Sequence, residues 1–356
     1  MQRIERIELA PEYRISRLLK GGWHLSSGHN ASVERRQAID DMAAFVEAGF
    51  TSFDCADHYL GVEQMIGDFR RVYPELGDKV QVHTKYVPDL DQLASLKPAD
   101  TVAIVERSMR RLGVECLDLV QFFWWDSTIP GAAATLSVLG DLRKAGKIRH
   151  LGVTNFGVAQ LAPLVESGVP ILVHQLQYSL VDRRVENGML DYCGKNGIRI
   201  LTYGHLLGGF MSETWLGQPE PGEPYANRSH RKYKLIIEDF GGWALFQELL
   251  AALIKVGRRY GVGPGEVALR WTLDQALVAG CIVGATSTRY LKRNTEVFGF
   301  RLSQQDLLEI DAICERRIGP SGDIYALEND RQGKHGRIMR QNQNQMEDQP
   351  WTQSAP

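Results

Sequence analysis

Three side chains that can transfer a proton together follow two candidate strands. Asp54 ends the apolar run Phe50–Asp54, Tyr59 follows it in the next loop, and Lys85 ends the run Val80–Lys85. Tyrosine is a poor acid at its ordinary pKa of about 10, but a nearby ammonium group favours the phenolate. We therefore expect Lys85 to make Tyr59 a better proton donor. Burying that ammonium group is costly without an acidic partner, and Asp54 would supply one.

Each of the three residues also has an ordinary structural interpretation. An aspartate after a strand commonly caps a turn, a tyrosine in a loop commonly packs against its neighbours, and a lysine at a strand end commonly reaches water. Proton transfer is favoured only if the segments that carry the three residues meet in space. The elements that position them therefore decide between the two interpretations.

A repeating alternation of short apolar runs and helix-period segments organises the chain. Thr101–Leu112, capped by Asp100 and ended by Gly113, and Val33–Ala48 are two of the predicted helices. After a predicted N-terminal hairpin there are eight strand candidates: Ile15–Lys20, Phe50–Asp54, Val80–Lys85, Leu117–Phe123, Ile148–Thr154, Ile171–Gln177, Ile198–Tyr203 and Ala279–Gly284.

Eight strands alternating with helices predict an α/β fold, either a parallel barrel or a doubly wound sheet. Polar residues and glycines follow one strand after another, as in the βα loops of a barrel, whereas a doubly wound sheet gathers them at one switch point. No strand leads into Gly-x-Gly-x-x-Gly and a helix. We therefore expect residues 1–330 to form a single (β/α)8 TIM barrel, whose strand ends bring the three residues to one mouth.

Two stretches interrupt the alternation. Residues 211–242, after the seventh strand, are rich in Pro, Gly and aromatic residues. They predict a long irregular loop, and such a loop inside a compact domain is usually functional. Residues 331–356 are polar and rich in Gln and Asn, which predicts a tail that is disordered or draped on the surface.

Composition excludes several classes of partner. Apolar residues make up 44% and charged residues 24% of the chain, and the formal net charge of −2 gives no basic field to collect nucleic acid or an anionic membrane. The five cysteines form no Cys-x-x-Cys pair, so neither a disulfide framework nor a metal site is expected. The sequence has no run of about 18 apolar residues and no signal-like N-terminus. We expect a soluble, cytoplasmic protein with a small-molecule partner.

The loop after the second strand resembles a family signature. FDCADHYLGVEQMIG is similar to the aldo-keto reductase pattern F-D-T-A-x-x-Y-G-x-x-E-x-x-x-G, and HTKYVP resembles the segment that carries that family's strand-three lysine. GVTNF, HQLQYS, LTYGHLLGG and IVGATSTRYLKRN follow in the family's order. The resemblance extends over residues 12–315 and implies a barrel that binds a nicotinamide dinucleotide.

The resemblance also implies roles for individual residues. The catalytic positions are matched by Asp54, Tyr59 and Lys85. The residues expected to hold the nicotinamide group, by hydrogen bonds to its carboxamide or by stacking on its ring, are Thr154, Asn155, Gln175 and Tyr203. Strand-end hydrogen bonding and rim packing are the structural alternatives for them. The positions where backbone comes close to the cofactor are Gly22, Trp23, Gly204, Leu206, Gly208, Gly209 and Gly284.

The last βα loop matches the segment with which the family binds the adenosine half of its cofactor. The residues expected there are Ser287, Arg289, Arg293 and Asn294. Two arginines can clamp a 2′-phosphate through charge-assisted hydrogen bonds, which favours NADP over NAD. Tyr290 stands where the family usually has an arginine, and two basic residues on a surface helix are commonly just solvated.

The sequence departs from the family at the end of the fourth strand. Most members carry a histidine there that orients and polarises the substrate carbonyl, whereas LDLVQFFWWD places Phe123 at this position. A phenyl ring donates no hydrogen bond, and losing one such donor typically costs about 10²- to 10³-fold in rate. His58, next to Tyr59, and His205 are candidates to replace it, whereas His83 is expected to be a core residue.

The predicted pocket is aromatic. Its walls are expected to be formed by Trp23, His58, Phe123, Trp124 and Trp125. Such a pocket suits a bulky hydrophobic substrate better than a sugar.

Three functional hypotheses follow. The first is an NADPH-dependent oxidoreductase that acts on a carbonyl, C=C or alcohol group of a bulky hydrophobic substrate, with Tyr59 as general acid and base. The second is a non-redox proton-transfer enzyme, such as an isomerase, a dehydratase or a ring-opening enzyme, on the same scaffold. The third is a non-catalytic NADP-binding subunit, similar to the β subunits of potassium channels. Phe123 weakens the first hypothesis relative to the second, and the intact catalytic trio argues against the third.

Overall fold

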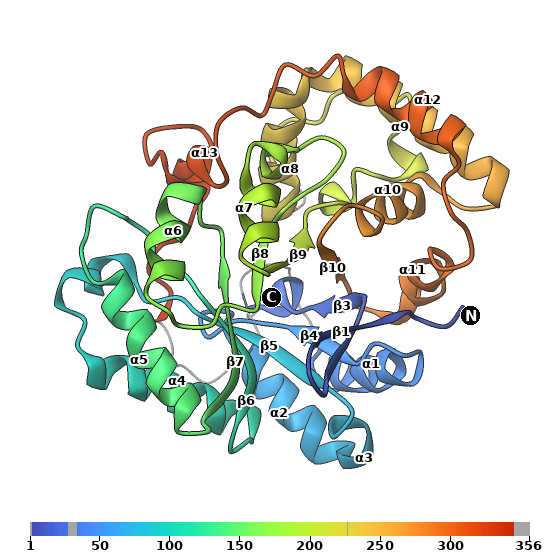
Figure 1. The fold of residues 1–356 in the computed structure, drawn as a ribbon. Coiled ribbons are helices and arrows are strands. Elements are labelled where there is room, and N and C mark those ends of the chain that lie inside the picture. The colour runs from blue at the N-terminus through green and yellow to red at the C-terminus, as the bar shows by residue number, and fades with distance from the viewer. Residues whose placement is uncertain (1, 28–33, 226, 345–356) are drawn as a thin grey trace.

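Parallel strands close into a barrel in which each strand pairs with its neighbour in sequence. The computed structural model describes residues 2–27, 34–225 and 227–344. Within them, eight strands follow one another around the barrel in the order β10-β3-β4-β5-β6-β7-β8-β9, all pairs being parallel (Figure 1). The prediction of a (β/α)8 barrel with an N-terminal hairpin is confirmed.

The strands and helices have the following bounds. The hairpin consists of β1 (Arg6–Ala10) and β2 (Tyr13–Ser16), and the barrel strands are β3 (Leu18–Gly21), β4 (Ser52–Asp54), β5 (Gln81–Tyr86), β6 (Leu117–Phe122), β7 (Ile148–Thr154), β8 (Val173–Gln177), β9 (Arg199–Tyr203) and β10 (Val278–Gly284). The helices are α1 (Arg35–Glu47), α2 (Val62–Val72), α3 (Pro74–Gly77), α4 (Pro98–Leu112), α5 (Ala132–Lys144), α6 (Val158–Glu166), α7 (Met189–Lys195), α8 (Arg228–Phe240), α9 (Gly242–Tyr260), α10 (Pro264–Leu273), α11 (Leu291–Glu296), α12 (Gln304–Cys314) and α13 (Ala326–Asn329).

Several predicted element ends differ from the structure by one to three residues. The first predicted strand is divided, because β2 ends at Ser16 in the hairpin and β3 begins at Leu18 in the barrel. Helix α4 begins at Pro98, three residues before the predicted start. Asp100 therefore lies inside the first turn, where its carboxylate accepts a hydrogen bond from the backbone N–H of Lys97 at 2.9 Å. Proline fits the first helical position because its missing N–H would be unpaired there anyway.

The second half of the long segment after β9 is helical rather than irregular. Helix α8 buries Tyr233, Ile236, Ile237 and Phe240, which recur every three or four residues and so form one apolar face. The side chain of Asn227 caps the helix by accepting a hydrogen bond from His230 N at 2.9 Å. The Pro- and Gly-rich sequence before Asn227 hid this short amphipathic pattern.

Membrane-spanning length and apolarity are not reached by any single helix of the described residues. Helices α8 and α9 meet the test only when taken together, and they are bent by 94° relative to each other.

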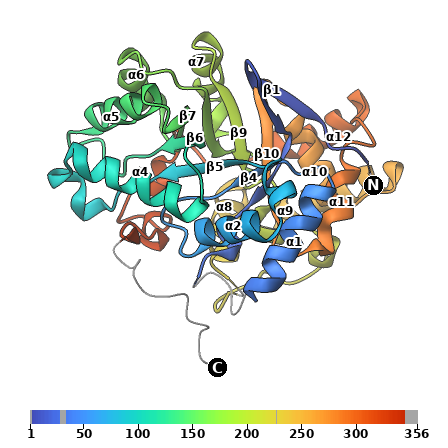
Figure 2. The same cartoon turned by 90° about the horizontal axis from the view of Figure 1, so that it is seen from below.

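The barrel interior changes from apolar to polar along the strands. At the amino ends, an inner cluster of Leu19, Leu119, Val173 and Leu201 is covered by Tyr13 of the hairpin. Figure 2 shows the hairpin and the C-terminal segment, residues 325–344, at opposite ends of the barrel. Because every second strand residue points inward, the inward residues two positions further on from Leu119, Val173 and Leu201 are polar or aromatic.

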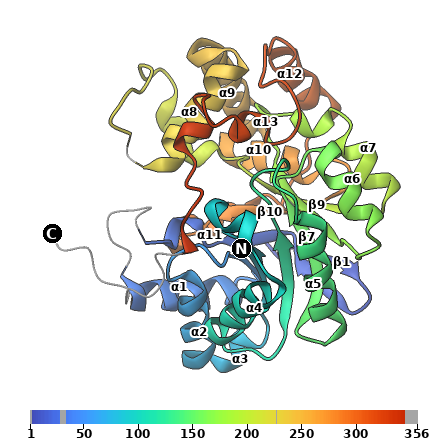
Figure 3. The same ribbon diagram turned by 90° about the vertical axis from the view of Figure 1, so that its left-hand side faces the viewer.

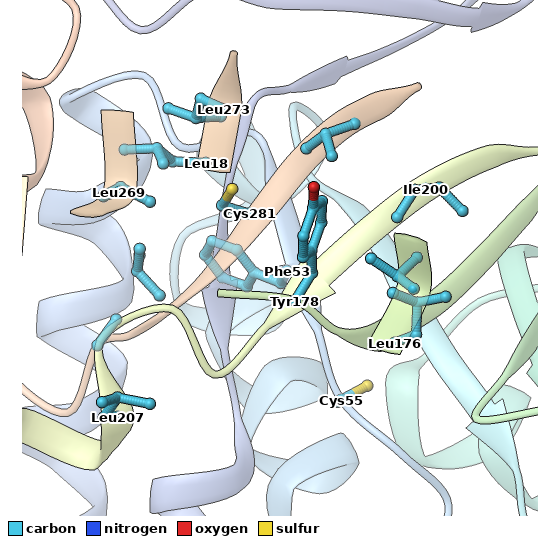
Figure 4. Packing of buried hydrophobic residues seen from close by; sticks show 14 of the residues in the cluster. Leu18, Phe53, Cys55, Leu176, Tyr178, Ile200, Leu207, Leu269, Leu273 and Cys281 are labelled. Atoms are coloured by element: carbon cyan, nitrogen blue, oxygen red, sulfur yellow. The ribbon is translucent and has the colours of Figure 1, made fainter. Parts of the chain in front are cut away.

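A second apolar layer lies between the strands and the helices. Figure 4 shows Leu269 and Leu273 of α10 near Leu18 and Cys281 of the barrel strands. This layer fixes the strands against their covering helices. The inward face at the carboxyl ends is left free for polar side chains.

The C-terminal segment lies on the carboxyl end of the barrel beside α8 (Figure 3). Arg331 pairs with Asp126 at 2.6 Å, and Asp89 Oδ1 accepts hydrogen bonds from the backbone N–H groups of Gln343 and Asn344 at 2.8 and 2.9 Å. Of the predicted tail, residues 331–344 are thus draped on the surface. Residues 345–356 lie outside the described residues.

A buried ion triad anchors α13. Arg184 donates to Asp182 at 2.7 Å and to Glu328 at 2.9 and 3.0 Å, and all three side chains are at most 2% exposed. Burial opposes ionisation of Glu328, but Arg184 outweighs it and lowers the pKa of this carboxyl. Two carboxylates on one guanidinium satisfy its fork-shaped set of donors.

We predict that Glu328→Gln lowers the free energy of unfolding by about 2–3 kcal/mol, because it leaves a buried guanidinium partly unpaired. Urea denaturation would measure this change. The matched control is Glu248→Gln, since Glu248 pairs with Arg316 on the surface with about half of its side chain exposed. Equal denaturation midpoints for the two variants would contradict a stabilising triad.

Candidate active site

A cavity of about 1180 Å³ opens at the carboxyl ends of the strands. All eight barrel strands contribute to its lining within two residues of their carboxyl ends: Gly21, Asp54, Lys85, Phe123, Thr154, Gln175, Tyr203 and Gly284. This is where the βα loops of such barrels build their binding sites. The predicted meeting of residues from separate segments therefore takes place.

An ion pair between Lys85 and Asp54 forms the floor of the cavity. Lys85 Nζ lies 2.9 and 2.8 Å from the two Asp54 carboxylate oxygens and also donates to Cys55 O at 2.9 Å. Both side chains are 4–5% exposed. Burial by itself would lower the pKa of Lys85, but Asp54 and Tyr59 outweigh it, so the pKa is raised. The ammonium group is therefore charged.

Two glutamines support this ion pair. Gln175 Nε2 donates to Asp54 Oδ1 at 2.6 Å and to Gln121 Oε1 at 3.0 Å. Gln121 Nε2 lies 3.4 Å from the same Asp54 oxygen. The side-chain nitrogen of Gln175 is thus bound to the ion pair and to Gln121. The side-chain oxygen, Oε1, is the group left to face the cavity. Gln121 was missed from the sequence, although its position two residues after the inward Leu119 indicates it.

Tyr59 lies beside the ion pair with aromatic neighbours on both sides. Its ring centroid is 5.1 Å from Lys85 Nζ, 4.9 Å from the Trp23 ring and 4.8 Å from the His58 ring. Burial raises the pKa of Tyr59 to about 12, and the opposite effect of Lys85 is smaller. Lys85 thus acts in the expected direction, but burial has the larger effect on the pKa. The tyrosine is fully protonated at neutral pH.

Phe123 lies in the cavity wall within an aromatic cluster. Its ring centroid is 4.8 Å from Trp125, 5.9 Å from Phe156 and 5.6 Å from Tyr325. Tyr325 belongs to the C-terminal segment and also lines the cavity. It was missed because nothing in its local sequence indicates that the segment crosses the mouth.

Trp124 does not line the cavity, contrary to expectation. Its indole N–H donates to Ile129 O at 3.0 Å, and the ring packs against Gly131. Successive residues of an extended chain point to opposite sides, so the inward position of Phe123 turns Trp124 outward. Trp23, His58 and Trp125 line the cavity as predicted.

A second group of residues surrounds Tyr203. Its hydroxyl donates to Asn155 Oδ1 at 2.7 Å, and Thr154 Oγ1 donates to Gln175 O at 3.0 Å. Asn155 has a φ of 58°, in the left-handed region. Lys232 of α8 lies over the Tyr203 ring, with its Nζ 4.9 Å from the ring centroid. Lys232 was missed together with the helix that carries it.

Glycines shape a groove that runs away from Tyr203. Gly204, Gly208 and Gly209 have φ values of 88°, 64° and 111°, which only glycine adopts readily, and all three line the cavity together with Leu206. Gly22 does not line it. Its N–H donates to Asp54 O at 2.7 Å, and a Cβ there would lie 2.9 Å from the same oxygen, so this glycine allows close packing behind the site.

The far end of the groove contains Arg289, Arg293 and Asn294, but Ser287 is not part of its lining. Asn294 is buried, and its Nδ2 has no partner among the described residues. The guanidinium of Arg293 makes two contacts of 3.0 Å with the Glu266 carboxylate. Arg289 is exposed and lies over the Tyr290 ring at 5.2 Å.

Comparison with known proteins decides the family. Residues 17–315 match the model of the Aldo/keto reductase family. The chain belongs to this family. Members of the aldo/keto reductase family are oxidoreductases that generally use NAD(P)H as their cofactor.

The matches to known proteins differ in how much of each relative they cover. Aldo-keto reductase YhdN of Bacillus subtilis is 29% identical over 316 residues, which cover 85% of this chain and 91% of that protein. Flagellar radial spoke protein 5 of Chlamydomonas reinhardtii is 32% identical over 307 residues, which cover 74% of this chain and only 55% of that longer protein. Among solved structures, glycerol dehydrogenase AKR11B4 from Gluconobacter oxydans is 25% identical with a TM-score of 0.73, covering 90% of this chain and 97% of that one.

The groove of this aldo/keto reductase fits a dinucleotide. Gly204, Gly208 and Gly209 line the groove in a left-handed turn, and backbone turns of this kind bind phosphate oxygens. The unpartnered Asn294 Nδ2 supplies a buried donor at one end, and the Tyr203 ring supplies a stacking surface at the other. These features match the two ends and the centre of such a cofactor.

The three histidines considered as replacements have different surroundings. His83 is buried at the amino end of the barrel and contacts the Tyr13 hydroxyl at 3.0 Å, as expected of a core residue. His205 lines the cavity, and burial lowers its pKa to about 3, so its imidazole is neutral. His58 lines the cavity next to Tyr59 and contacts Asp57 Oδ1 at 3.2 Å through Nδ1. Its Nε2 is the group available to a substrate.

Proposed function

We propose that the protein is an NADPH-dependent aldo-keto reductase that acts on a carbonyl, C=C or alcohol group of a bulky hydrophobic substrate. The observation that carries the proposal is the buried Lys85–Asp54 pair with Tyr59 beside it, placed between an aromatic pocket and a glycine-lined groove. The aromatic walls favour an apolar substrate body. The unpaired cysteines are compatible with a reducing compartment such as the cytoplasm.

The groove residues would hold the dinucleotide in an extended arrangement. Tyr203 would stack on the nicotinamide, and Asn155, with the carbonyl oxygen of Gln175, would orient its carboxamide. The backbone from Gly204 to Gly209 would face the pyrophosphate, and Asn294 would contact the adenosine end. The bound cofactor supplies the hydride.

Tyr59 would supply or remove the proton at the reacting oxygen. Lys85 stabilises negative charge that develops on the tyrosine oxygen, because its ammonium group is permanently charged and lies next to the ring. Asp54 keeps that ammonium group charged and in place. A proton donor with a pKa of about 12 stays protonated across the neutral and mildly alkaline range, so the rate of reduction should not fall there through ionisation of Tyr59.

Phe123 gives the site its main departure from the family pattern. Without a donor there, the hydrogen bond to the substrate oxygen must come from Tyr59, with His58 Nε2 or the Tyr325 hydroxyl as further donors at the cavity wall. Burial raises the pKa of Tyr325 well above its ordinary value, so its hydroxyl keeps its proton. The same departure favours a non-redox proton transfer as the second candidate function.

We predict that Tyr59→Phe lowers turnover by about 10²- to 10⁴-fold while leaving the dinucleotide Kd within a few-fold, because the hydroxyl moves a proton but binds little of the cofactor. The assay follows NADPH oxidation with a panel of aldehydes, ketones and quinones, and mass spectrometry of the products. A gain of two hydrogens supports reduction, whereas an unchanged formula supports the non-redox alternative. Full activity in the variant would return Tyr59 to a packing role.

We predict that NADPH binds more tightly than NADH and that Arg289→Ala removes most of the difference. Arg293→Ala should change it less, because the Arg293 guanidinium is already paired with Glu266. Calorimetric titration of both cofactors into the wild type and both variants would measure this. Equal affinities of the wild type for the two cofactors would sink the NADPH assignment.

We predict that the wild type reduces simple aldehydes poorly and that Phe123→His raises this activity by up to about 10²-fold, because imidazole can donate to the developing oxyanion. Phe123→Leu, which adds no donor, is the control and should show no gain. Initial rates with a neutral aromatic aldehyde would test this. Brisk reduction by the wild type would mean that His58 or Tyr325 already supplies the hydrogen bond.

A further inference from the structure

Positive charge gathers at one side of the cavity mouth. Arg228 and Lys232 reach it from α8, and Arg337 and Arg340 reach it from the C-terminal segment. The two elements lie side by side, joined by contacts of Lys334 and His335 with the last turns of α8. These cations therefore line the same cavity as Tyr59 and Lys85.

Several other arginines at this end of the barrel have carboxylate partners. Arg184 pairs with Asp182 and Glu328, Arg293 with Glu266, and Arg331 with Asp126. By contrast, the ion pairs among the described residues include neither Arg228 nor Arg340. Two cations without an acidic partner at the entrance of a binding cavity attract an anion.

Arg228 is held in place by contacts that leave its charge uncompensated. Its Nη2 donates to Ile338 O at 3.3 Å, and its guanidinium carbon lies 5.8 Å from the Trp23 ring centroid. Arg340 is two residues further along the chain from Ile338 and lines the same cavity. Burial, and then the charge of Arg340, lower the pKa of Arg228 to about 10. Two like charges are thus brought together beside an aromatic wall, which an intervening anion would stabilise.

We infer that Arg228 and Arg340 bind the carboxylate of an anionic substrate whose apolar body lies along Trp23. The Trp23 ring contacts Arg228 on one side and Tyr59, at 4.9 Å, on the other, so the arginine is separated from the proposed proton donor by about one aromatic ring. A guanidinium group binds a carboxylate through two parallel hydrogen bonds. This inference rests on the proposed function for the identity of the reacting end.

The contact with Trp23 assigns Arg228 to the substrate. Ser229, the residue after Arg228, packs against the glycine turn of the dinucleotide groove, but the Arg228 guanidinium lies over Trp23, whose ring is also next to Tyr59. Arg340 belongs to the C-terminal segment, whose residues Met339 and Gln343 also line the cavity. We therefore assign the two arginines to the substrate rather than to the cofactor phosphates.

The test measures binding without turnover. Calorimetric titrations of NADPH-saturated protein would compare 4-methylbenzoate with 4-methylbenzamide, which share a shape and differ in charge. The carboxylate should bind at least tenfold more tightly. Arg340→Gln and Arg228→Gln should abolish the difference, and Arg340→Lys should keep part of it, because charge remains without the two-pronged geometry. Arg331→Gln is the matched control on the same segment and should keep all of it.

Three outcomes would overturn the inference. They are equal affinities for acid and amide in the NADPH-saturated wild type, a carboxylate preference that is present in matched titrations of the cofactor-free protein and disappears when NADPH saturates it, and tighter binding of 4-methylphenyl phosphate than of the carboxylate. The second would assign the arginines to the cofactor phosphates, and the third to a phosphorylated substrate. Because these titrations involve no reaction, their result stands even if the protein fails to reduce 4-carboxybenzaldehyde, which would count against the proposed function alone.

Discussion

The buried ion pair between Lys85 and Asp54 is the interaction on which the rest of the mouth depends. Enclosing two charges is favourable only when their remaining donors and acceptors are satisfied. Gln121, Gln175 and the carbonyl of Cys55 meet this requirement. These groups come from β6, β8 and the chain just after β4, so closure of the barrel brings the partners together. The pair in turn supplies the fixed positive charge next to Tyr59.

The arginines of this structure differ in whether carboxylates neutralise their charge. Arg184 is surrounded by two carboxylates and contributes to anchoring the segment that carries Tyr325. Arg228 and Arg340 line the same cavity, and the ion pairs of the described residues include neither. The first arrangement is complete in the protein alone. The second would be neutralised only by a bound anion. This contrast distinguishes a structural ion cluster from a binding surface.

The sequence allowed the barrel and the polar floor to be predicted because their signals are periodic or local. Strand ends carry Asp54 and Lys85, and the alternation of strand residues also indicates Gln121. It did not allow the residues that close the mouth to be predicted. Helix α8 lies within a Pro-rich stretch, and Tyr325 reaches the site from a segment with no signal of its own. Such placements depend on tertiary contacts, as the carboxylate of Asp89 with the backbone of Gln343 illustrates.

The sign of the pKa shift on Tyr59 shows a second limit of sequence reasoning. Pairing a tyrosine with a lysine predicts a lowered pKa, but burial acts in the opposite direction and is larger here. How deeply a side chain lies is a property of the whole fold. The direction of the Lys85 effect could therefore be predicted from the sequence, whereas the larger effect of burial could not.

The draped C-terminal segment separates the substrate rim from the catalytic floor in the chain. It is attached through the Arg184–Glu328 pair, the ring of Tyr325 and polar contacts, and within residues 2–27, 34–225 and 227–344 no barrel strand pairs with it. Substitutions there can alter the entrance while the ladder of strands stays intact. The barrel can thus stay the same between relatives while the substrate specificity changes. A substrate carried over from a relative on the strength of matching strands would then be wrong, even where every catalytic residue agrees.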